Sequence, residues 1–190
     1  MSRFGYVIVT LLAAELFVGL FVTVAVIHPR PRLLWNASAS APLGLYRIQP
    51  AGDPSVGTLV AVAPPERLAH WMAERRYLGD GVPLLKHIAA KAGQRICRVG
   101  DIVSIDLRPV AVARERDRMG RLLPVWQGCR TLAASELLLL NPAVPDSLDG
   151  RYFGPLPAST VIGRAVPILT RDAPDAPLTW RGWSGESPRT

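Results

Sequence analysis

A serine and a lysine, each in a distinctive local sequence, are the residues of this chain best suited to covalent chemistry. Ser40 lies in a run of small residues that ends at Pro42, and Lys86 lies within the apolar run Leu-Leu-Lys-His-Ile. A lysine that burial has stripped of its proton can act as the general base for a serine nucleophile, a variant of the serine-histidine-aspartate triad. Each stretch alone also fits a plainer interpretation, the end of a serine-rich linker for Ser40 and a solvated strand lysine for Lys86.

The two stretches predict the local structure that this chemistry needs. Small residues followed by a proline favour a tight, accessible turn around Ser40. Side chains alternate along a strand, so Lys86 and Ile88 share one face of the expected strand 84–90. If that face is buried, lowering the pKa of Lys86 from about 10.4 to about 7 corresponds to roughly 4 to 5 kcal/mol, which the rest of the fold must offset.

Composition and charge argue against several other functions. The formal net charge is +7, but the arginines are scattered through apolar segments and form no basic stripe interleaved with aromatic residues. Nucleic-acid binding is therefore not expected. The three histidines and two cysteines lack metal-ligand spacing, so we expect neither a metal nor a cofactor. A basic surface beside a membrane segment instead favours anionic lipid headgroups.

The two cysteines, Cys97 and Cys129, are separated by 32 positions and form no CxxC motif. In an oxidising compartment, an even pair of cysteines favours a disulfide over two buried free thiols, which is the alternative. Closing a loop of this length contributes on the order of 3 kcal/mol in the chain-entropy model.

The amino-terminal region carries a membrane-length apolar run. Residues 5–27 contain Glu15 as their only charged residue, and at 1.5 Å per residue they span a bilayer core of roughly 30 Å. A cleaved signal peptide has a shorter apolar region and a small-residue cleavage site, so residues 1–30 are predicted to be an uncleaved transmembrane signal anchor. Arginines stand on both sides of the run, and the positive-inside rule alone leaves its orientation open.

The rest of the chain has the pattern of a mainly antiparallel β domain with one short helix. Short apolar and β-branched runs, bounded by Gly or Pro, predict strands at 44–48, 58–63, 84–90, 95–99, 102–107, 110–114, 122–126, 137–140 and 160–169. Residues 66–77 follow two prolines and repeat apolar side chains at helical spacing. Residues 28–36 are expected to be an extended linker, 31–171 one catalytic domain, and 172–190 a disordered tail.

Three segments, taken in order, resemble the successive sequence boxes of the type I signal peptidase superfamily. They are residues 36–46, the Leu-Leu-Lys-His-Ile-Ala box at 84–89, and residues 146–155 followed by Gly-Arg-Ala at 163–165. The Ser-x-Pro-x-Gly-Leu-Tyr form of the first box is most similar to the conjugative-transfer branch, the TraF-type peptidases. This resemblance implies a signal-peptidase-like antiparallel β catalytic domain behind a single amino-terminal transmembrane helix.

The resemblance also implies a role for individual residues. Ser40 matches the nucleophile and Lys86 the general base. Ser38 matches a residue whose hydroxyl helps the backbone N–H of Ser40 to hold the oxyanion, and such a donor is typically worth about 3 kcal/mol. Ser147 matches the residue that orients the lysine, while Asp149 and Arg151 match an ion pair that braces the site.

The sequence departs from the general signal peptidase pattern at several positions. Ala41 stands where general signal peptidases carry methionine, and the following proline is one residue closer to the nucleophile. Both changes suit the transfer branch. The Gly-Asp-Asn-Arg-Asp run of the family is replaced by Asn-Pro-Ala-Val-Pro at 141–145, the Pro-Gly-Asp after the lysine by Ala-Gly-Gln at 92–94, and a serine by Gly150.

The expected function follows from this resemblance. It is a membrane-anchored serine endopeptidase, with its catalytic domain on the periplasmic side of the bacterial inner membrane, that processes a pilin precursor for conjugative transfer or type IV secretion. Water as acceptor gives a linear product, and the amino terminus of the substrate as acceptor gives a cyclic one. Other conjugation proteins are further expected partners. The alternatives are a general type I signal peptidase for exported preproteins and a non-catalytic scaffold subunit of a secretion apparatus.

Overall fold

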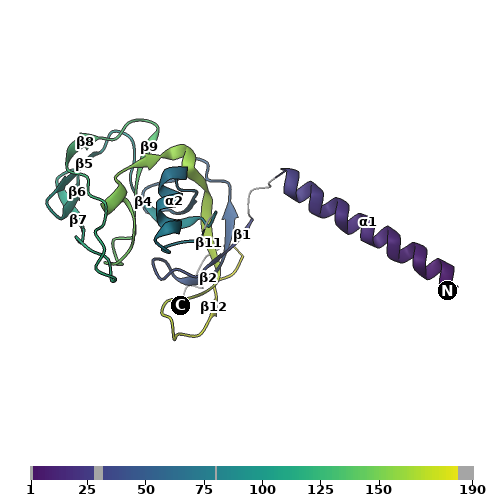
Figure 1. The fold of residues 1–190 in the computed structure, drawn as a ribbon. Coiled ribbons are helices and arrows are strands. Elements are labelled where there is room, and N and C mark those ends of the chain that lie inside the picture. Colours follow the sequence, from purple (N-terminus) through teal and green to yellow (C-terminus); the bar gives the residue numbers. More distant parts are fainter. Residues whose placement is uncertain (1, 28–31, 80, 184–190) are drawn as a thin grey trace. The chain divides into compact units, whose positions relative to one another are not determined.

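The computed structural model describes residues 2–27, 32–79 and 81–183, which fall into two units, 1–31 and 32–190 (Figure 1). The first unit contains helix α1 (Arg3–Ile27), whose 25 residues reach a mean hydropathy of 2.5 over an 18-residue window. At 1.5 Å per residue this helix is long enough to cross a bilayer core. The predicted amino-terminal apolar helix is thus present.

The second unit is built on a large antiparallel sheet. Its strands are β1 (Leu33–Asn36), β2 (Leu43–Gln49), β3 (Leu59–Val62), β4 (Leu84–Ala90), β9 (Glu136–Leu140), β10 (Leu156–Pro157), β11 (Val161–Arg171) and β12 (Thr179–Trp180). They follow the order β1-β2-β11-β3-β4-β9-β10, with β12 beside β11. The mainly β antiparallel fold expected from the sequence is confirmed.

The centre of this sheet is formed by strands that are apolar on both faces. Val60 and Val62 of β3 pack with Ile88 of β4 and with leucines of β9 in one buried cluster. Leu138 and Leu140, on the opposite face of β9, belong to a second cluster shared with the small sheet. Because both faces are covered, β9 reads as a continuous leucine run and not as an alternating one.

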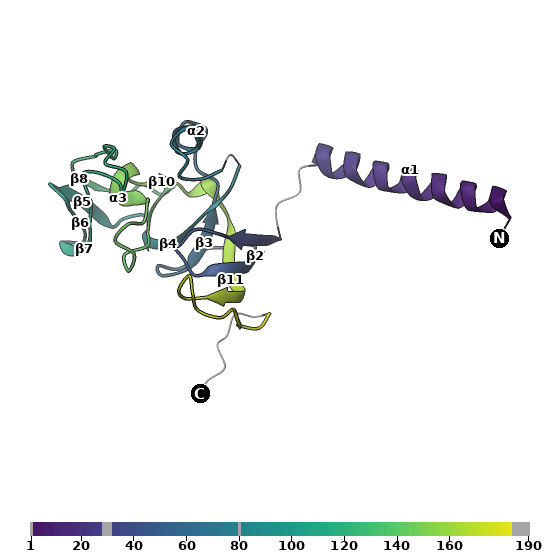
Figure 2. The same ribbon diagram turned by 60° about the horizontal axis from the view of Figure 1, so that its bottom comes forward.

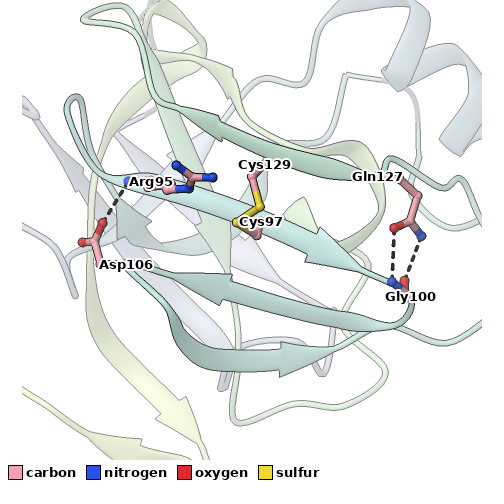
Figure 3. The surroundings of a disulfide bond; sticks show 6 residues. All are labelled: Arg95, Cys97, Gly100, Asp106, Gln127 and Cys129. Atoms are coloured by element: carbon pink, nitrogen blue, oxygen red, sulfur yellow. Dashed lines mark hydrogen bonds between the residues drawn. A yellow bond between two sulfur atoms is a disulfide. The ribbon is translucent and has the colours of Figure 1, made fainter.

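A small sheet lies at one end of this unit in both ribbon views (Figures 1 and 2). Its strands are β7 (Arg108–Val112), β6 (Ile102–Ile105), β5 (Arg95–Val99) and β8 (Gly128–Thr131), in that order. Cys97 of β5 is directly opposite Cys129 of β8, and the two are joined by a disulfide (Figure 3). Beside it, the side-chain amide of Gln127 bonds both backbone groups of Gly100.

The helices differ from the sequence expectation. Helix α2 (Glu66–Glu74) ends earlier than residue 77, because Arg76 adopts a left-handed conformation with φ of 57°. The prediction of a single short helix in the domain is wrong, since α3 (Gly150–Phe153) and the 3₁₀ turn Ala158–Thr160 are also present. Both elements are about one turn long, which is too short to show a helical period in the sequence. The sequence signal for α3 is Asp149, a residue type that is favoured as a helix N-cap.

Several strand expectations are also corrected. The expected strand 122–126 is replaced by an isolated bridge between Arg116 and Leu122. The sequence pattern does not predict strands β1, β8, β10 and β12. Strand β1 lies in the segment predicted to be a linker. Strand β12 lies within the tail predicted to be disordered, where it pairs with Leu169 and Thr170. Residues 28–31 and 184–190 of the linker and tail lie outside the described residues. Short strands with few apolar residues gain their stability from the neighbour they pair with, which a local pattern does not show.

Candidate active site

Ser40 lies in a tight turn that connects β1 to β2. The side chain of Asn36 holds this turn from within: its Nδ2 donates to the carbonyls of Ser38, Ala41 and Pro42 at 2.9 to 3.1 Å, and its Oδ1 accepts from the Ser38 N–H at 3.0 Å. Asn36 is buried, so these contacts are protected from water. The run of small residues therefore forms the turn that the sequence predicts for a nucleophile.

Ser38 and Ser40 present their hydroxyls to one another. Their Oγ atoms are 3.0 Å apart, and the Ser40 N–H points toward the Ser38 Oγ at 3.4 Å. The two groups expected to hold an oxyanion, the Ser38 hydroxyl and the Ser40 N–H, are thus adjacent to the expected nucleophile. Their oxyanion role stays a prediction.

Lys86 is buried in the centre of β4, with 2% of its surface exposed. Its Nζ donates to the Ser147 Oγ at 2.9 Å. Burial lowers the pKa of Lys86 from 10.5 to about 8, while the charge of Asp149 opposes this change and that of Arg151 adds to it. Leu85 is buried as well, because β4 is covered on both faces, and simple alternation therefore does not describe this strand.

Ser40 and Lys86 both line one open pocket of about 610 Å³. Arginines just after α2 and in the segment after β7 also line this pocket, among them Arg75, Arg114 and Arg118. A second, largely apolar pocket of about 710 Å³ also reaches Ser40. The expected nucleophile and base therefore line a common pocket. In the described part of the chain, no cluster of three His, Cys, Asp or Glu residues could hold a metal ion.

The segment after β9 carries the remaining predicted residues. Asp149 and Arg151 form a buried ion pair, with Arg151 Nε donating to Asp149 Oδ1 at 2.9 Å and Arg151 Nη2 to Oδ2 at 2.8 Å. Asp149 also caps α3 by accepting the Arg151 N–H. The Arg151 guanidinium also donates hydrogen bonds to the carbonyls of Val144 and Pro145. These bonds hold the loop that places Ser147 beside Lys86.

Sequence reasoning missed Asn141, the residue that follows β9. It is 2% exposed and its side chain contacts both the Ser40 turn and the strand that carries Lys86. The only sequence signal is the Asn-Pro pair that ends a leucine run, which marks the end of a strand and says nothing about what the amide contacts.

The structure therefore brings together Ser38, Ser40, Lys86 and Ser147, backed by the Asp149–Arg151 pair. A serine hydroxyl and a buried, easily deprotonated lysine in one cleft of a β domain are the parts of a serine-type peptidase site.

Comparison with known proteins places this chain in a family. Residues 3–170 match the family model described as signal peptidase, peptidase S26, and the chain belongs to that family. A probable conjugal transfer protein TraF from Sinorhizobium fredii is 38% identical over 145 residues, 71% of this chain and 76% of the relative. A conjugal transfer protein TraF from Agrobacterium fabrum is 34% identical, covering 72% and 82%, and a plasmid transfer protein TraF from Escherichia coli is 32% identical, covering 71% and 81%.

A crystal structure of a signal peptidase I from Enterococcus faecalis V583 covers 60% of this chain and 97% of its own length, with 16% identity and a TM-score of 0.36. The family makes this chain a serine-type peptidase, and the long apolar helix α1 fits a membrane anchor.

Replacing Lys86 with methionine is expected to stabilise the folded domain at neutral pH. Lowering the lysine pKa from 10.5 to about 8 means that the buried ammonium destabilises the folded state by up to about 3 kcal/mol below pH 8. Between pH 8 and 10.5 the unfolded chain binds a proton that the folded chain does not, so the wild type gains stability as pH rises through this range. Denaturant unfolding should give Lys86→Met a larger free energy of unfolding than the wild type at pH 7. This difference in stability should be largely gone near pH 10.5.

The matched control is Lys91→Met, because Lys91 is more exposed and pairs with Asp53 at the surface. It should change stability by less than about 1 kcal/mol. A Lys86→Met protein no more stable than the wild type at pH 7 would show that Lys86 is not desolvated.

Proposed function

We propose that this protein is a serine endopeptidase with a Ser40–Lys86 dyad that processes a pilin precursor during conjugative transfer. The observation that carries the proposal is that Ser40 and a buried Lys86, whose pKa is lowered to about 8, line the same pocket. The relatives named for conjugal and plasmid transfer supply the biological context.

The proposed reaction begins with attack by Ser40 Oγ on the scissile carbonyl carbon. Neutral Lys86 accepts the hydroxyl proton at Nζ and returns it to the leaving amine when the C–N bond breaks, which leaves an acyl group on Ser40. The Ser38 hydroxyl and the Ser40 N–H stabilise the oxyanion. Ser147 accepts a hydrogen bond from Lys86 and so orients the amine toward the cleft.

The acyl group is then transferred to an acceptor. Water gives a linear product, whereas the amino terminus of the pilin gives a cyclic one through the same attack on the ester carbonyl. In both cases Lys86 takes a proton from the acceptor and Ser40 regains its own.

We also propose that the domain faces the periplasm, with α1 in the inner membrane. The Cys97–Cys129 disulfide supports this orientation, because disulfides persist in oxidising compartments. Protease added to spheroplasts should degrade the domain, and full protection of the domain would contradict this orientation.

Mass spectrometry of the major pilin encoded on the same element tests the proposed substrate. Cells carrying the wild-type protein are compared with cells carrying Ser40→Ala, Lys86→Met or the control Lys91→Met. Mature pilin is expected only in the wild type and the control, and a product lighter than the linear chain by one water would identify cyclisation. If pilin matures in all four strains, this protein is not the pilin peptidase. The function is then that of a general type I signal peptidase or of a non-catalytic scaffold subunit.

A further inference from the structure

We propose that Asn141 is a positioning residue, which holds the Ser40 turn against the strand that carries Lys86. The inference rests on the proposed function, in which Ser40 and Lys86 act together. It assigns to one side-chain amide the task of setting the distance between them.

The amide of Asn141 takes the place of a peptide group in the sheet. Strand β4 pairs with β9 up to the His87–Leu140 pair, after which the chain turns away. Beyond that point Asn141 Nδ2 donates to the Leu85 carbonyl at 3.0 Å, and Asn141 Oδ1 accepts the His87 N–H at 3.2 Å. The two backbone groups that flank Lys86 are therefore satisfied by a side chain, and the main chain is free to leave the sheet and carry Ser147 toward the lysine.

The same amide also reaches the nucleophile turn. Asn141 Nδ2 donates to the Ser40 carbonyl at 2.6 Å, so the carbonyl oxygens of Ser40 and Leu85 lie within hydrogen-bond distance of one nitrogen atom. Strands β2 and β4 are separated by β11 and β3, and in a flat sheet they would be about 14 Å apart. The Ser40 turn nevertheless lies close enough to β4 for the Asn141 amide to bond both the Ser40 and the Leu85 carbonyls.

The orientation of the amide is fixed by its partners. Two carbonyl oxygens accept from its nitrogen and one backbone N–H donates to its oxygen, so the two amide ends cannot be exchanged. The oxygen also lies 2.9 Å from His87 Nδ1. Asparagine is the residue of this length that supplies two hydrogens and an acceptor together. Aspartate keeps only the acceptor, and alanine keeps neither.

The backbone of Asn141 connects this bridge to the buried ion pair. Its N–H donates to Asp149 Oδ2 at 2.9 Å, and its carbonyl accepts from Arg151 Nη2 at 3.0 Å. Because both sides of the peptide are held, the side chain has a fixed base from which to position Ser40. A residue held in this way can keep two reacting groups within the few tenths of an ångström that catalysis needs.

The experiment compares Asn141→Ala and Asn141→Asp with the wild type in the full-length protein in detergent. Cleavage is followed on internally quenched peptides with alanine before the scissile bond. We expect kcat to fall about 100-fold in both variants with KM little changed, because the bound peptide still fits the pocket while Ser40 is displaced from Lys86. Asn141→Asp distinguishes the two ends of the amide, since it keeps the acceptor for the His87 N–H and loses both donors.

Gln127→Ala is the matched control. Gln127 also bonds both backbone groups of one residue, Gly100, through its side-chain amide, but does so beside the disulfide of the small sheet (Figure 3). It should leave kcat and KM unchanged. The pH dependence of kcat/KM supplies the second readout. Its midpoint should stay near the wild-type value in Asn141→Ala, because Lys86 remains buried on β4, which β3 and β9 flank.

The outcomes separate this inference from the proposed function. If the wild type cleaves in a Ser40-dependent way and both Asn141 variants keep its kcat, the positioning role is refuted and the proposed function stands. Full activity in Asn141→Asp alone would assign the residue to the His87 contact and also refute it. A midpoint that moves to the ordinary value of lysine would show that Asn141 acts through burial of the base. If Ser40→Ala cleaves as fast as the wild type, the proposed function fails and this inference fails with it.

Discussion

Lys86→Arg is expected to abolish peptide cleavage as completely as Ser40→Ala, by at least about 10⁴-fold in kcat. Arginine keeps the positive charge and much of the length of lysine, but it does not lose its proton in proteins and so cannot act as a base. Only two of the 22 basic residues of this chain are lysines, Lys86 and Lys91. A chain that uses arginine almost everywhere else has a residue that can be deprotonated at the position where the proposed mechanism needs one.

The control for this prediction is Lys91→Arg, which should keep full activity. The double variant Ser40→Ala/Lys86→Arg should be no slower than either single variant, because residues that act as a unit do not contribute additively. More than about 1% of wild-type activity in Lys86→Arg would rule out Lys86 as the base.

The pH dependence provides the same test without a mutation in the site. The neutral amine is the active form, so kcat/KM should fall about tenfold per pH unit below the pKa of about 8 and level off above it. Labelling with ¹³Cε-lysine gives only two lysine signals, and Lys91→Arg assigns them. The Lys86 signal should titrate near 8 in the absence of substrate, and titration above 10 would contradict the buried base.

Arg151→Met is expected to destabilise the domain by about 3 to 5 kcal/mol at neutral pH. Arg151 is 1% exposed, and its guanidinium bonds both oxygens of Asp149 as well as the carbonyls of Asn141, Val144 and Pro145. Its removal leaves the Asp149 carboxylate buried without its cation and three carbonyls without this donor. Urea unfolding of the full-length protein in detergent measures the loss.

Arg130→Met is the control for this prediction, because Arg130 pairs with Glu136 at a partly exposed position. Its loss should change stability by less than about 1 kcal/mol. The double variant Asp149→Leu/Arg151→Met should be less destabilised than the sum of the two single variants, since it leaves no unpaired charge. A loss in Arg151→Met as small as that in Arg130→Met would show that the ion pair is not buried in solution.

The sequence predicts most of the secondary structure of the domain centre and fails at its edges. Strand 84–90 is observed with the predicted bounds, because its apolar run is long and its ends carry proline and a turn. The expected strand 122–126 is absent: Leu123 is buried beside Tyr152, while Leu122 and Val125 stay exposed. Apolar content alone does not distinguish a strand from a segment that packs through one side chain.

By itself the sequence determines the apolar helix α1, the β class, and the three ordered boxes that show the family. Each of these depends on residues close together in the chain, whose periodicity or spacing is visible without a structure. Tertiary structure alone decides that both faces of β4 are covered, because Lys86 and Leu85 are both buried by segments distant in the sequence. It also decides the contacts of Asn141, whose amide donates to the Ser40 carbonyl, 101 positions earlier. The pKa of a lysine and the position of a nucleophile depend on what the fold packs around them, and a local pattern carries no record of those neighbours.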